Sequence, residues 1–405
     1  MDDHVVFFFG SGISRPTFRA VSDFDFEGSV KEVTQKVLNA PLVFTEHKRY
    51  PFPVSAESNP NMGEPHETSE ERVTRLRNFL DAVRRHAEPF LDRFNRDVTY
   101  EELYSLCGEV QTNQKKQALA HQPVNPEVSH FAEALQGEVG EVLLDSSEDP
   151  RSPLAFTANE ATVLISGVVR ELLSNTPEIQ GLDPLLAAIE ELDCVTIVTL
   201  NHDLLLEQLL KEHNIDFDDG FEREDSDVRR YSPDRLFDGP NDVTVIKPHG
   251  SVNWYIDREQ SEYVAFPIND PIPEPGELQT LLQKEPFILH GYRKEERYPV
   301  DIVGDMVDAL LLALHETSTV IESGFGWTDY GMYHHLNRYL GRSEQNRLLL
   351  LHQTDDFQQG EESTDPPHPM DYSNSFGHPS DGLIRSLPKY LSETSWDEIQ
   401  AHVDE

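Results

Sequence analysis

Four short apolar runs, each ending abruptly in a polar or glycine-rich turn, constrain the fold of this chain most. The clearest run, VTIVTLNHD from Val195 to Asp203, stops at Thr199 and is followed by Asn201 and Asp203. The other runs are residues 5–9, 243–247 and 317–322, which stop at Gly10-Ser11-Gly12-Ile13-Ser14, Pro248-His249-Gly250-Ser251 and Ser323-Gly324-Phe325-Gly326. Because ligands bind where the strands of an open α/β sheet end, we expect one site to be shared by these turns.

Apolar residues at helical spacing fill much of the chain between the first two runs, as at Val73, Leu76 and Leu80. We therefore predict an α/β fold, with a Rossmann-like, mostly parallel sheet, helices on both faces and an inserted α-helical module. The expected divisions are 1–29 and 193–352 for the sheet domain, 30–192 for the helical insertion with a mobile loop near 50–69, and 353–405 for a polar, acidic C-terminal segment.

The charge of the chain excludes one class of partner. Its 74 acidic and 33 basic residues give a net charge of -41. Phosphate backbones require a basic surface, so no direct contact with nucleic acid is expected. Such self-repulsion is tolerable where salt screens it, which predicts a salt-rich cytoplasm and a protein that needs salt to remain folded.

Neither a membrane segment nor a metal is expected. No apolar run is long enough to cross a bilayer, and the N-terminus lacks the basic start of a signal peptide, which predicts a cytoplasmic protein. Cys107 and Cys194 belong to no CxxC pattern, so they exclude a zinc ribbon, and we expect both to be buried, inert thiols. The 17 histidines show no metal-ligand spacing.

The turn at Gly10 to Ser14 has a use in nucleotide binding. Without Cβ atoms, Gly10 and Gly12 let the backbone approach a pyrophosphate and direct N–H groups at it. The third glycine of the dinucleotide fingerprint is replaced by Arg15, so a tight turn without a ligand is an equal alternative.

Polar side chains that suit recognition and proton transfer follow the second and third runs. Asn201 and Asp203 suit a carboxamide or ribose hydroxyl, although one of them could instead cap the helix expected at 204–213. His202 should point the other way and serve the structure. At a strand end before Gly250, His249 is a candidate general base, the alternative being a core histidine.

Taken together and in this order, Gly10 to Ser14, Thr199 to Asp203, Lys247 to Trp254 and Ser323 to Asp329 resemble the motifs of sirtuin-like domains. More narrowly, they resemble the NAD-hydrolysing sirtuin-like proteins of prokaryotic antiviral defence. The chain departs from the family at Ser11, where Ala is common, and at Pro16-Thr17-Phe18-Arg19, which has Thr for Asp.

The resemblance implies a role for each motif. It implies that His249 is the catalytic base and that Asn201, with Asp203 and Thr199 beside it, holds the nicotinamide ribose and carboxamide. The NAD phosphates would lie on Gly10, Ser11, Gly12, Ile13 and Ser14, and the adenosine side would be lined by Gly324 and Phe325, with Ser251 nearby.

The resemblance also implies a reaction: NAD+ is a substrate, cleaved to nicotinamide and ADP-ribose, with no metal. The missing zinc ribbon favours water as acceptor, and the alternatives are an NAD-dependent protein deacylase and a non-catalytic module that binds NAD or ADP-ribose. Such an activity would be held off until infection is sensed, then deplete NAD in abortive infection. The implied partners are copies of the chain in a homo-oligomer, or a DNA-translocating ATPase or other sensor encoded nearby.

Overall fold

The computed structural model describes most of the chain outside several connecting stretches. The described residues are 4–14, 33–38, 69–92, 98–118, 126–139, 153–174, 179–222, 228–237, 242–271, 273, 281, 285–289, 294, 298–299, 301–327, 329–351 and 383–404. The expected mobile loop near 50–69 and the stretch Pro16 to Arg19 lie outside them, except for residue 69.

Six parallel strands form the central sheet, in the order β4-β2-β1-β7-β8-β9. Numbered along the chain, this order is 3-2-1-4-5-6, which is typical of dinucleotide-binding folds and confirms the predicted Rossmann-like α/β class. Phe9 pairs with both Thr199 and Ser323, so the three central strands end level. The strands are β1 (His4–Phe9), β2 (Cys194–Thr199), β4 (Val243–Ile246), β7 (Thr319–Ser323), β8 (Arg347–Leu351) and β9 (Ile384–Leu387).

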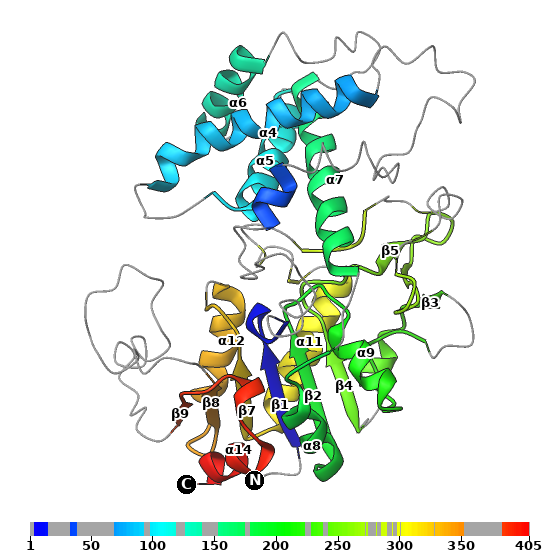
Figure 1. The fold of residues 1–405 in the computed structure, drawn as a ribbon, viewed down its shortest axis with the longest axis vertical. Coiled ribbons are helices and arrows are strands. Elements are labelled where there is room, and N and C mark those ends of the chain that lie inside the picture. The colour runs from blue at the N-terminus through cyan, green and yellow to red at the C-terminus, as the bar shows by residue number, and fades with distance from the viewer. Residues whose placement is uncertain are drawn as a thin grey trace.

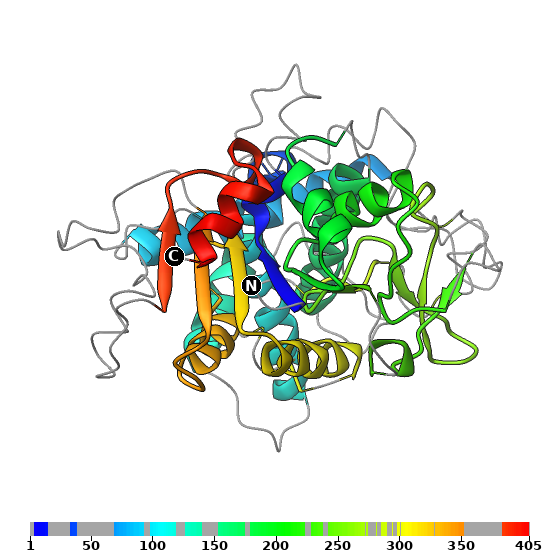
Figure 2. The same cartoon turned by 90° about the horizontal axis from the view of Figure 1, so that it is seen from below.

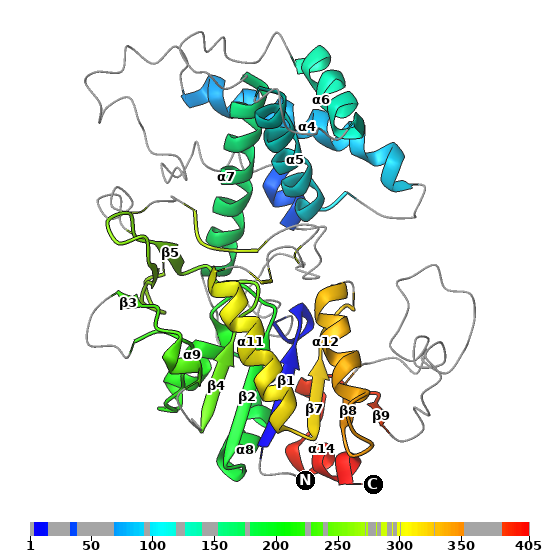
Figure 3. The same ribbon diagram turned by 180° about the vertical axis from the view of Figure 1, so that it is seen from behind.

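Helices cover both faces of this sheet, so its strands are apolar on both sides. Alternate residues of β1 enter different cores: Val6 and Phe8 pack in one, Val5 and Phe7 in the other. Figures 2 and 3 show α11 and α12 together on the first face. That face is covered by α11 (Asp301–Glu316) and α12 (Tyr330–Leu340), and the opposite face by α8 (Asp183–Glu191), α9 (Leu205–Glu212) and α14 (Trp396–Asp404).

Two boundaries differ from those expected. Strand β9 pairs with β8, and Trp396 and Ile399 of α14 pack in the sheet core, so part of the expected C-terminal segment 353–405 belongs to the sheet domain. Similarly, Leu185 of α8 packs in that core, although the helical insertion was expected to continue to residue 192. Neither boundary could be predicted, because short elements after long polar stretches carry little periodic signal.

In the described part of the chain, four long helices form the inserted module, which lies over the carboxyl edge of the sheet (Figure 1). They are α4 (Ser69–Leu91), α5 (Tyr100–Ala118), α6 (Pro126–Val139) and α7 (Pro153–Ser174). Their apolar core also contains Leu204 and Val252, which follow Asp203 and Ser251 directly in the chain. The module therefore packs against the turns that carry the candidate site residues.

A small antiparallel sheet, β3-β6-β5, lies beside β4, with the short helix α10 (Asp234–Phe237) next to it. Its strands are β3 (Arg229–Arg230), β5 (Trp254–Ile256) and β6 (Tyr263–Ala265). A buried bidentate pair, Arg229 with Asp219 at 2.9 and 2.8 Å, fixes β3 to the preceding loop. Of the helices in the described part of the chain, none combines the length and apolarity that a bilayer crossing requires.

Candidate functional site

The turns after β1 and β7 are packed backbone against backbone. Gly10 N–H donates to the Ser323 carbonyl at 3.0 Å, and Gly12 N–H to the Gly324 carbonyl at 3.1 Å. A Cβ built on Gly10 would lie 2.3 Å from the Gly324 oxygen and 2.5 Å from Phe325 Cα. These glycines permit close approach of the two turns. Their amides are occupied by the carbonyls of Ser323 and Gly324, so the predicted phosphate contacts depend on the rest of the Gly10 to Ser14 turn.

Substitution of Gly324 by Ala should unfold or severely destabilise the sheet domain. Gly324 has φ of +75°, and its Cβ would lie 2.6 Å from Gly12 Cα. Backbone strain and a clash with main chain that cannot move aside both oppose the change. Urea denaturation should show a loss above about 3 kcal/mol, whereas Gly326→Ala, with open space around its Cβ, is the matched control. Equal stability of both variants would contradict this packing.

Asn201 and Asp203, which follow β2, meet at Ser14. Asn201 Nδ2 donates to the Ser14 hydroxyl at 2.9 Å and to the Gly10 carbonyl at 3.1 Å, and the Ser14 hydroxyl donates to Asp203 Oδ2 at 2.8 Å. Leu205 N–H donates to Asp203 Oδ1 at 3.2 Å, but the N-cap of α9 is Leu204 and no side chain caps the helix, so neither Asn201 nor Asp203 is its N-cap. Asn201 Oδ1 makes no hydrogen bond with the described residues and remains available as an acceptor.

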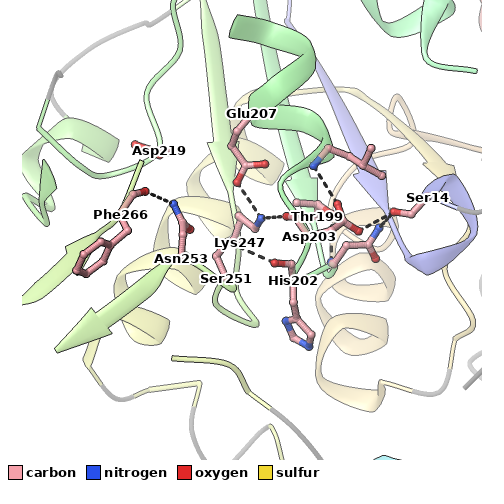
Figure 4. Close-up of polar contacts among 12 residues, drawn as sticks. Ser14, Thr199, His202, Asp203, Glu207, Asp219, Lys247, Ser251, Asn253 and Phe266 are labelled. Carbon is pink, nitrogen blue, oxygen red and sulfur yellow. Dashed lines mark hydrogen bonds and ion pairs between the residues drawn. The ribbon is translucent and has the colours of Figure 1, made fainter. Parts of the chain in front are cut away.

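Behind Asp203 lies a buried ion pair. Lys247, at the end of β4, is 1% exposed and binds Glu207 Oε1 of α9 at 2.8 Å. Its ammonium also donates to the Asp203 carbonyl (Figure 4). Burial raises the pKa of Glu207, and Lys247 opposes that rise. The pair thus ties the strand that leads to His249 to the turn that carries Asn201.

His249 is contacted by two side chains that are distant in the chain, those of Tyr298 and Asp329. Its Nε2 lies 2.9 Å from Asp329 Oδ2 and 3.1 Å from the Tyr298 hydroxyl. The Tyr298 hydroxyl donates to the same Asp329 oxygen at 2.6 Å, and Asp329 Oδ1 accepts from Met332 N–H at 3.0 Å as the N-cap of α12. Since β2 and β1 separate β4 from β7, these contacts close over the ends of the two central strands.

The surroundings of His249 favour its neutral form. Burial lowers the pKa of His249, the Lys294 ammonium lowers it further, and Asp329 and Glu101 oppose the shift. Burial alone would raise the pKa of Asp329, but hydrogen bonds from His249 and Tyr298 outweigh it and hold that pKa well below its usual range. We therefore describe the pair as an ionised Asp329 accepting from a neutral imidazole, which suits a general base.

His202 was expected to point the other way from Asn201 and Asp203. Its ring lies near His249, with the two centroids 6.2 Å apart. Figure 4 shows His202 directed away from Ser14, while its carbonyl accepts from Val252 N–H at 3.0 Å and from the Ser251 hydroxyl at 3.4 Å. The imidazoles of His202 and His249 therefore lie near each other because the Ser251 hydroxyl and the Val252 amide hold the turn after β2.

The other predicted site residues lie at the same edge of the sheet, and some of them are buried. Thr199 is buried and accepts from Asn201 N–H at 3.2 Å, and Ser11 is exposed. The Phe325 ring packs against Phe8, with centroids 5.2 Å apart, so an adenosine contact there would involve its backbone. The predicted roles of these residues stay predictions.

The cysteines differ in burial. Cys107 is fully buried in the helical module, but Cys194 is only half-buried, so the expectation of two buried thiols is correct for Cys107 alone. Burial raises the pKa of both thiols. Within the described ranges, no three His, Cys, Asp or Glu side chains are grouped as a metal site.

Sequence reasoning missed three residues of this arrangement. Asp329 lay within a quoted motif without a role, and its position just before a helix pattern was an available signal for the cap. Lys247 was also quoted without a role, since nothing in the sequence pairs it with Glu207. Tyr298 belongs to no motif, and only the fold brings it to His249.

Comparison with known families finds a match over the part of the chain that contains Asn201, His249 and Asp329. Residues 195–366 match the family model of the SIR2-like domain, a stretch that begins in β2 and includes β4, β7 and β8 but not β1 or the helical module. A search of curated proteins gives no match. A SIR2-like domain indicates chemistry on NAD, which makes NAD+ the indicated substrate. The chain therefore contains a SIR2-like domain at residues 195–366.

Proposed function

We propose that this protein hydrolyses NAD+ at the bond between nicotinamide and ribose. Water adds to the ribose C1′, the C–N bond breaks with its electron pair leaving on nicotinamide, and the products are nicotinamide, ADP-ribose and a proton. The observation that carries the proposal is the juxtaposition, at the carboxyl edge of a 3-2-1-4-5-6 sheet, of the SIR2-like Asn201 turn and a buried His249 paired with Asp329.

The described residues fit the substrate and its transition state. Asn201 Oδ1 can accept a hydrogen bond from a ribose hydroxyl, because the bonds from Nδ2 to Gly10 and Ser14 already fix the orientation of the amide. Cleavage develops positive charge on the ribose, which the carboxylate of Asp203 at this edge would stabilise. His249 would draw a proton from water or a ribose hydroxyl, the step that a neutral, buried imidazole performs near pH 7.

Chromatography of purified protein incubated with NAD+ tests the proposal. Equal release of nicotinamide and ADP-ribose is expected, measured at about 0.1 M and about 1 M salt because screening changes severalfold across that range. Release that requires an acyl-lysine peptide would favour the deacylase alternative. Binding of NAD+ without any release, in both salts, would favour the non-catalytic module and refute hydrolysis.

The pH dependence of turnover should change when the charge of Lys294 or Glu101 is removed. His249 also faces Asp329, Tyr298 and the ring of His202. Lys294 lowers and Glu101 raises the His249 pKa, and the two form an ion pair at 3.4 Å. Since the base acts when deprotonated, Lys294→Gln should move the acidic limb of kcat to higher pH and Glu101→Gln to lower pH. Limbs that stay in place, or shift together, in pH–rate profiles would exclude His249 as the titrating base.

We extend the proposal to the setting that the resemblance implies. An unregulated NAD+ hydrolase would be toxic, so its activity in antiviral defence would depend on a trigger, supplied by a homo-oligomer or by a neighbouring sensor such as a DNA-translocating ATPase. Light scattering with and without NAD+, and assays with the products of adjacent genes, test these partners. An active monomer needing no other protein would refute the partner requirement.

A further inference from the structure

We propose that Asp329 is a positioning residue that fixes the tautomer of His249, so that Nε2 carries the proton and Nδ1 is the nitrogen that accepts one. The inference deepens the proposed hydrolysis and rests on it for its catalytic consequence. The tautomer itself can be measured without any reaction.

The hydrogen bonds around Asp329 define the assignment. Tyr298 donates to Asp329 Oδ2 at 2.6 Å, and His249 Nε2 lies 2.9 Å from the same oxygen. A carboxylate only accepts, so Nε2 must be the donor, and a neutral imidazole then has its lone pair on Nδ1. No described residue hydrogen-bonds to that Nδ1 atom. The partner of one ring nitrogen therefore sets the function of the other.

A second contact makes this orientation rigid. Asp329 Oδ1 caps α12 by accepting from Met332 N–H, so the carboxylate cannot rotate without exposing an orphan amide. The stacked rings of His249 and Tyr298, with centroids 6.2 Å apart and an interplanar angle of 16°, restrict the imidazole further. The beginning of α12 is thereby coupled to the histidine that follows β4.

The variant Asp329→Asn should change the tautomer of His249 while it keeps the N-cap of α12. Asn is as good an N-cap as Asp, so its Oδ1 should keep the Met332 amide. Its Nδ2 would then face His249 Nε2 as a donor, which reverses the tautomer and places a proton on Nδ1. Tyr298→Phe is the matched control, because it removes a hydroxyl from the same cluster and leaves the carboxylate to accept from Nε2.

Two measurements test the inference. In 15N-histidine NMR, with the signals of His249 assigned from their loss in His249→Gln, we expect Nε2–H in the wild type and in Tyr298→Phe, and Nδ1–H in Asp329→Asn. In kinetics, Asp329→Asn should lose about 10²-fold or more in kcat, as for a misoriented base, with little change in KM. Thermal unfolding should show all variants folded.

Specific outcomes would overturn it. Nδ1–H in the wild type, an unchanged tautomer in Asp329→Asn, or wild-type kcat in that variant each refute the role of Asp329. If Asp329→Asn does not fold, Asp329→Ser keeps a capping oxygen and should give a mixture of tautomers, a single Nε2–H form again refuting the inference. Absence of NAD+ cleavage in the wild type would refute the proposed hydrolysis, while the NMR result would still decide the tautomer.

Discussion

Replacing His249 with Ala should lower kcat for NAD+ cleavage by about 10²–10⁴-fold, the usual contribution of a general base. His249 is 3% exposed, and removal of its side chain leaves Asp329 bound to Tyr298 and to the α12 backbone, so we expect the variant to fold. Steady-state nicotinamide release measures the loss. Calorimetry with NAD+ should show that binding changes far less than turnover.

The control for this loss is His130→Ala, which removes a histidine whose side chain is 84% exposed on α6 of the helical module. It should leave both kcat and KM unchanged. Full turnover by folded His249→Ala would end the case for His249, and His202, with its ring 6.2 Å away, would then be the next base to examine.

Replacing Lys247 with Met should destabilise the protein by about 3–5 kcal/mol, the usual cost of breaking a buried ion pair. Glu207 would be left buried without its cation, and its Oε2 already has no hydrogen bond among the described residues. The turn that carries Asn201 would also lose the ammonium bound to the Asp203 carbonyl. Urea denaturation measures the change in the free energy of unfolding.

Two further variants identify the cause. Lys211→Met removes an exposed lysine from α9, the helix that carries Glu207, and should change the free energy of unfolding by less than about 0.5 kcal/mol. Glu207→Leu combined with Lys247→Met should recover much of the loss, because an apolar pair carries no desolvation penalty. In Lys247→Met alone, Glu207 keeps its proton in the folded state, so stability should fall as pH rises above the pKa of an unfolded glutamate. A stable, pH-insensitive single variant would contradict the ion-pair argument.

The sequence by itself determined the α/β class and the edge of the sheet at which the candidate site lies. Its four apolar runs are buried on both faces because helices cover the sheet twice, and each run must end where side chains become polar. The i, i+2 spacing of Asn201 and Asp203 after β2 was visible in the sequence, but their meeting at Ser14 was not.

Only the tertiary structure decided the contacts between the turns. The pairing of His249 with Asp329 requires two loops to close over β2 and β1, and no local pattern encodes the path of such loops. The Gly10 and Gly12 amides bind the carbonyls of Ser323 and Gly324 because two turns distant in the chain are packed together. Strand β9 joins the sheet for a similar reason, since the edge of β8 supplies the partner that its own short sequence cannot specify. Periodicity reports which side of an element is buried, whereas long-range packing decides what is buried against it.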